Sequence, residues 1–175
     1  MSADRFRPWP LAATVLLAAV LWFVTFALPW ASFWVKISLS ASLLAGISLL
    51  LQPLRREEVR VDPRAVLIGL ASAALLYFVF WAGRAASMSL FDFAGRQIGG
   101  IYHKGEGTPL WAIALLLFCV TGPSEEIFWR GYLQRSLMGR FGRWPGWALA
   151  TAVYAGVHVW SLNFMLIGAA AVAGA

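Results

Sequence analysis

Long apolar runs alternate with short polar segments along the chain. The runs cover about residues 11–28, 31–51, 65–83, 109–138 and 147–160, and a shorter one covers residues 163–175. About 20 apolar residues in an α-helix span the roughly 30 Å hydrocarbon core of a bilayer. The pattern therefore predicts an all-α, polytopic transmembrane helical bundle with about five complete spans plus a truncated sixth.

The final run is shorter than a complete span. As a helix, residues 163–175 reach only about 20 Å at 1.5 Å per residue, and no polar flank follows them. We therefore expect residues 1–175 to form a single transmembrane domain that is C-terminally incomplete, as a piece of a longer protein would be.

The composition excludes the soluble and disordered classes. Apolar residues make up 61% of the chain and charged residues 13%, with a mean hydropathy of +0.72. A soluble domain has about 45–50% apolar and about 25% charged residues. The single cysteine, Cys119, excludes an intrachain disulfide and a Cys-based zinc cluster. It lies inside an apolar run, where we expect it in the packed core.

The net charge of +6 comes from basic residues that lie mostly between the apolar runs. Such residues favour the cytoplasmic side of a membrane, so they indicate orientation rather than a nucleic-acid partner. With a cytoplasmic N terminus, the inner segments carry Arg5, Arg7, Arg55, Arg56, Arg60, Arg64, Arg135, Arg140 and Arg143, and the outer segments carry Lys36, Arg84, Arg96 and Lys104. We predict an integral membrane protein with its N terminus inside, lipid as a partner and no nucleic-acid partner.

Three ionisable residues follow the fourth apolar run with almost no polar transition: Glu125, Glu126 and Arg130. Glu125 is 16 residues after Pro109, about 24 Å along a helix, which places it inside the membrane. Each such side chain costs roughly 2.5–3.5 kcal/mol at mid-membrane, so the group needs partners or a water-filled cavity.

Helical spacing supplies one partner. Glu126 and Arg130 are four residues apart and can form an ion pair, whereas Glu125 is rotated by about 100° and points elsewhere. A carboxylate in a partly dry cavity suits a general base that activates water. Pro123 lacks a backbone donor, so we expect it to kink the helix or to start a new one beside Glu125.

The next span contributes an imidazole. His158 lies at nearly the same depth as Glu125, with Tyr154 one helical turn before it. It is a candidate to share a water with Glu125, to orient it or to hold a metal. Structural alternatives stay open: the charged residues could tie helices together, His158 could pack by hydrogen bonds, and Trp129 is more often packing than a substrate contact.

The spacing Glu-Glu-x-x-x-Arg, within the segment GPSEEIFWRGYLQ, and the later aromatic-x-x-x-His resemble motifs of the CPBP family. These are the CAAX-protease and bacteriocin-processing intramembrane proteases, also called the abortive-infection family. The type II CAAX prenyl endopeptidase is their best-known branch. Tyr154 stands where the family more usually has Phe. A third family motif, His-x-x-x-Asn or His-x-x-x-Asp on a later helix, would lie after the last residue of this sequence.

The resemblance implies an intramembrane endopeptidase. Glu125 would activate the hydrolytic water with help from His158, Glu126 and Arg130 would support the site, and Tyr154 and Trp129 would lie close to it. The family has often been classed as metallopeptidases, so zinc held by Glu125 and His158 is an alternative to a metal-free water, and no cofactor is firmly expected.

The resemblance leaves the substrate and the activity open. The substrate would be a peptide or protein, prenylated or not, such as a CAAX-type protein or a leader peptide. The resemblance and the compact size favour a bacterial inner membrane. The alternative functions are a catalytically inactive immunity or scaffold protein of the same fold, and a proton-coupled carrier.

Overall fold

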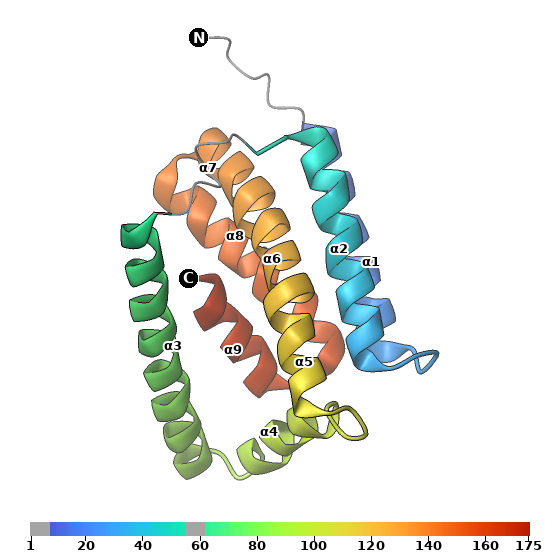
Figure 1. Cartoon of the computed structure of the whole chain (residues 1–175), viewed down its shortest axis with the longest axis vertical. Helices are drawn as coiled ribbons and strands as arrows, with labels where there is room; N and C mark the ends of the chain where they lie inside the picture. Colours follow the sequence, from blue (N-terminus) through green and yellow to red (C-terminus); the bar gives the residue numbers. More distant parts are fainter. Residues whose placement is uncertain (1–7, 55–61) are drawn as a thin grey trace.

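The described part of the chain, residues 8–54 and 62–175 of a computed structural model, is helical and contains no strand (Figure 1). The prediction of an all-α bundle is confirmed. The α-helices are α1 (Pro8–Ala27), α2 (Phe33–Leu51), α3 (Pro63–Leu90), α4 (Ala94–His103), α5 (Leu110–Leu116), α6 (Gly122–Glu125), α7 (Arg135–Phe141), α8 (Arg143–Val157) and α9 (Phe164–Gly174). Two π-helical segments, η1 (Leu117–Thr121) and η2 (Glu126–Gln134), and a 3₁₀ turn, η3 (His158–Ser161), complete the set.

Four helices of the described part are long and apolar enough to cross a membrane. They are α1, α2, α3 and the continuous helix Leu110–Phe141, which contains α5, η1, α6, η2 and α7. The predicted fifth span corresponds to α8 and η3, where the helix type changes at His158, and the sixth corresponds to the 11 residues of α9. The predicted total of about five spans is therefore approximate.

The core lies where α1, α2, η2 and α8 meet. Its most deeply buried large side chains include Trp22 of α1, Leu44 of α2, and Phe128 and Leu133 of η2. The α1–α2 pair lies at one side of the molecule and α3 at the other (Figure 1). Because α3 buries none of its residues, its apolar surface is left for lipid.

The long helix stays continuous through Pro123 because its hydrogen bonding changes there. The Gly122 N–H donates to the carbonyl of Leu117, five residues earlier, at the end of the π-helical segment η1. A Cβ on Gly122 would lie 2.5 Å from that carbonyl oxygen, so only glycine fits this turn. The expected kink or helix start at Pro123 is thus a local widening of the helix, immediately before the two glutamates.

Two features of the last spans concern single residues. Asn163 caps α9, since its side chain accepts from the Leu166 N–H at 2.9 Å. The expectation that Cys119 lies in the core was wrong, because its side chain is exposed on the long helix. In this span both the lipid-facing and the packed sides are apolar, so hydropathy does not distinguish them.

The orientation prediction is left open. Five of the arginines on which it depends, Arg5, Arg7, Arg55, Arg56 and Arg60, lie outside the described residues.

Candidate active site

Glu125 is the last residue of α6, and its carboxylate is held by the neighbouring helix α8. The Tyr154 hydroxyl donates a hydrogen bond of 2.9 Å to Oε2 of Glu125, and both side chains are partly buried. This contact joins residues 29 positions apart and brings the two sequence motifs together. One hydroxyl leaves most of the accepting positions of the carboxylate available to a water.

Glu126 points away from this contact. Its side chain is 62% exposed and forms an ion pair with Arg130 at 3.4 Å, so the predicted i, i+4 pair is confirmed. The Arg130 guanidinium also lies over the Tyr154 ring, 5.1 Å from its centre, and donates to the backbone carbonyl of Ala173. Arg130 therefore connects η2 with both α8 and α9.

His158 begins the 3₁₀ turn at the end of α8 and is almost fully buried. Its Nδ1 lies 2.7 Å from the backbone oxygen of Tyr154, and its Nε2 lies 3.3 Å from the indole nitrogen of Trp22. A carbonyl only accepts and an indole N–H only donates, so these partners assign the tautomer that carries its proton on Nδ1.

The structure gives no hydrogen bond between Glu125 and His158 within its described part; both groups contact Tyr154 instead. The hydroxyl of Tyr154 reaches the carboxylate, while its ring lies 5.0 Å from the imidazole, edge to face. The expected direct sharing of a water by Glu125 and His158 therefore remains a prediction.

Trp129 forms a wall of this cluster. It is 2% exposed and packs edge to face on the rings of Trp22 and Tyr154, at centroid distances of 5.5 and 5.0 Å. Its indole N–H has no hydrogen-bond partner among the described residues. These contacts agree with the packing interpretation of Trp129.

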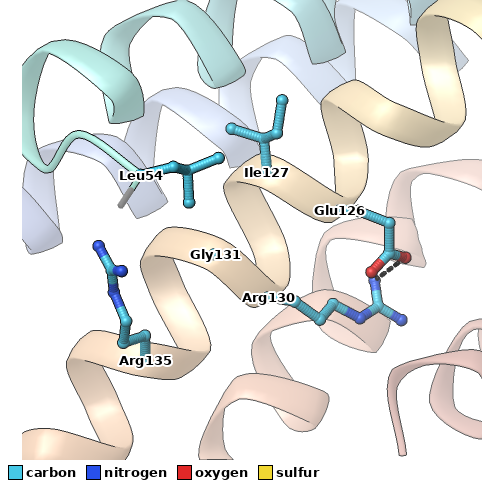
Figure 2. Close-up of a pocket in the computed structure, with 6 residues that line it drawn as sticks. All are labelled: Leu54, Glu126, Ile127, Arg130, Gly131 and Arg135. Carbon is cyan, nitrogen blue, oxygen red and sulfur yellow. Dashed lines mark ion pairs between the residues drawn. The ribbon is translucent and has the colours of Figure 1, made fainter. Parts of the chain in front are cut away.

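A groove of about 400 Å³ runs along η2 (Figure 2). Its lining residues are Leu54, Glu126, Ile127, Arg130, Gly131 and Arg135. Figure 2 shows Glu126 and Arg130 pointing toward one another, with Leu54 and Ile127 together on the other side of the helix. A second cavity of about 10 Å³, enough for about one water, lies between Trp129, Arg130, Gln134 and Tyr154 and is also bordered by Ala150 and Gly174.

A catalytic zinc does not fit the residues of the described part. Such a zinc usually takes three protein ligands, and residues 8–54 and 62–175 bring together no group of three His, Cys, Asp or Glu side chains. Of the two candidate ligands, His158 has both ring nitrogens engaged by Trp22 and Tyr154. We therefore derive no step through a metal.

Sequence reasoning missed Trp22, which lies at the centre of this cluster. Tryptophan is enriched at the membrane–water interfaces, yet Trp22 lies well inside the first apolar run. That unusual depth is the signal that could have identified it.

A comparison with known protein families matches the C-terminal part of the chain. The family model described as "Type II CAAX prenyl endopeptidase Rce1-like" matches residues 107–175. Residues 107–175 are similar to this family, and we refer to them as the Rce1-like region. The match confirms the resemblance to the CAAX-protease family and includes both sequence motifs, from Glu125 to His158. Searches of curated proteins and of solved structures find no match. The Rce1-like region supplies the carboxylate, Tyr154 and the imidazole, whereas Trp22 comes from outside it.

Proposed function

We propose that this membrane protein is an intramembrane endopeptidase in which Glu125 activates the hydrolytic water. The observation that carries the proposal is the hydrogen bond from Tyr154 to Glu125, because it joins the two motifs of the Rce1-like region at one place. The family match supports a protease at the level of the family.

The chemistry follows from one carboxylate and one water. Glu125 takes a proton from the water while the water oxygen bonds to the carbonyl carbon of the scissile peptide. When the tetrahedral intermediate collapses, the C–N bond breaks and Glu125 returns the proton to the leaving amine. A positioned general base and acid of this kind contributes roughly 10²–10⁴-fold to the rate.

The remaining residues have supporting roles in this proposal. Tyr154 orients the carboxylate, and His158 lies on the other side of the Tyr154 ring. Arg130 packs η2 against α8 and is paired with Glu126, and both residues border the groove in which a peptide would lie. The proposed substrate is a peptide or protein at the membrane, with a prenylated CAAX-type peptide as the first choice.

The decisive experiment compares Glu125→Gln with Glu126→Gln in proteoliposomes that contain a farnesylated CAAX-type peptide. We expect Glu125→Gln to lower cleavage by roughly 10²–10⁴-fold, because it removes the base. Glu126→Gln is the matched control: 62% of the Glu126 side chain is exposed, so we expect a loss of less than about tenfold. Equal cleavage by both variants and the wild type would refute the assignment of Glu125.

One observation favours the alternative, a catalytically inactive scaffold of the same fold. Both nitrogens of His158 are hydrogen-bonded inside the protein, as in a packing residue. The scaffold function would be supported if the wild type cleaves neither the farnesylated peptide nor an unmodified leader peptide.

A further inference from the structure

The imidazole of His158 is enclosed by aromatic rings from two parts of the chain. Tyr154 comes from the same helix, while Trp22 and Phe26 come from α1, with ring centres 6.0 and 5.9 Å from the imidazole. Only 7% of His158 is exposed, so the ring has little room to rotate. Its orientation therefore depends on α1, which lies outside the Rce1-like region.

The two hydrogen bonds of the ring have different origins. The bond from Nδ1 to the Tyr154 carbonyl is local, because the two residues are four positions apart. The bond from the Trp22 indole to Nε2 joins residues 136 positions apart. We propose that Trp22 is a positioning residue of the site, whose indole N–H holds Nε2 of His158 as the proton-accepting nitrogen of the ring.

The indole of Trp22 is itself rigidly placed. Trp22 is fully buried, and its ring meets the Trp129 ring at 89° with a centroid distance of 5.5 Å. One turn further along α1, the hydroxyls of Thr25 and Ser40 are 3.1 Å apart and join α1 to α2. The donor is therefore fixed by the core rather than by His158.

The tautomer has a chemical consequence. With the proton on Nδ1, the lone pair of the ring is on Nε2, on the side that faces α1. The Trp22 indole N–H donates to this lone pair over 3.3 Å. Trp22 thus fixes Nε2 as the accepting nitrogen and keeps the ring from turning.

The first test measures the tautomer directly and does not depend on catalysis. The chain has two histidines, so His103→Gln leaves His158 as the one ¹⁵N-histidine signal in detergent micelles. We expect Nδ1 to be the protonated nitrogen and Nε2 to show the ¹⁵N shift of a hydrogen-bonded acceptor. In Trp22→Phe, which retains an aromatic ring, the Nε2 resonance should move to the position of an acceptor without a donor.

The matched control is Trp34→Phe on α2. Trp34 also has a buried indole N–H, but this group has no partner among the described residues, so its removal should leave the His158 signals unchanged. A proton on Nε2 in the wild type would overturn the proposal, as would an unchanged Nε2 resonance in Trp22→Phe. If Trp22→Phe fails to fold, the wild-type Nε2 resonance decides the question, because the shift of an acceptor without a donor would overturn the proposal.

The second test rests on the proposed function. In the farnesylated-peptide assay, Trp22→Phe should lower kcat roughly two- to tenfold, the effect of one lost neutral hydrogen bond, with KM unchanged. A rise in KM with constant kcat would overturn the positioning role. If the NMR result holds while no variant or wild type cleaves, the proposed function fails and the positioning of His158 by Trp22 stands.

Discussion

Tyr154→Phe offers a test of the site that needs no substrate. The substitution removes the hydroxyl that reaches Glu125 but keeps the ring, which packs against Trp129 and His158. It also replaces the residue by the one that the resembled family more usually has. Its effect on stability therefore reports the contact between the two motifs and little else.

The size of that contact follows from its geometry. The Tyr154–Glu125 distance of 2.9 Å is in the normal range for a hydrogen bond, and both side chains are partly buried. A net contribution of roughly 0.5–1.5 kcal/mol is typical of neutral partners, and roughly 1.5–3 kcal/mol of a charged one. A double-mutant cycle with Glu125→Ala isolates this pairwise term, which we expect to be about 1–3 kcal/mol.

The assay is reversible unfolding in detergent or bicelles for the wild type, both single variants and the double variant. Tyr132→Phe is the control, because the Tyr132 hydroxyl makes no hydrogen bond within the described part of the chain, while its buried ring stacks on Phe128. A coupling below about 0.5 kcal/mol, within the error of such cycles, would show that the hydroxyl does not hold Glu125. The conclusion that this hydrogen bond joins the two motifs would then be refuted.

The remaining predictions concern packing and pH. Gly146→Ala should destabilise the fold by about 1–3 kcal/mol, because its Cβ would lie 2.4 Å from backbone atoms of Met138. The control is Gly139→Ala, whose Cβ would lie in open space and should change stability little. Thermal unfolding measures both effects. Burial, and secondarily the positive charge of Lys36, lowers the pKa of Lys104 from the ordinary 10.5. The folded chain then binds fewer protons than the unfolded chain between the lowered pKa and 10.5, so stability rises with pH across that window. Acylation followed by mass spectrometry should show the Lys104 amine reacting at lower pH than an ordinary lysine, and reaction only near 10.5 would contradict the prediction.

The parts of the fold that sequence reasoning predicted depend on local rules. Apolar run length places the spans, and the i, i+4 spacing predicts the ion pair between Glu126 and Arg130. Each of these needs only neighbouring residues and the thickness of a bilayer. The same local rules predict that the side chains of Glu125 and Glu126 point in different directions around the helix.

The parts that sequence reasoning did not predict depend on which helix lies beside which. In an apolar span the side that faces lipid and the side that faces protein have the same composition, so the exposure of Cys119 had no local signal. The π-helical segment η1 ends in a turn that only Gly122 fits, and the pattern of apolar residues does not predict such a turn. The role of Tyr154 as the link between Glu125 and His158 likewise requires the packing of α8 on η2.

The candidate site is built from two parts of the chain, the Rce1-like region and helix α1. The Rce1-like region contains both the carboxylate of Glu125 and the imidazole of His158, the two groups that the sequence motifs single out. The donor to Nε2 comes from α1, so the same two motifs on a different first helix would keep the local bond from Nδ1 to the Tyr154 carbonyl but would lose the partner of Nε2. In a protein with the same two motifs but no indole N–H at the position of Trp22, we therefore expect another group to donate a hydrogen bond to Nε2.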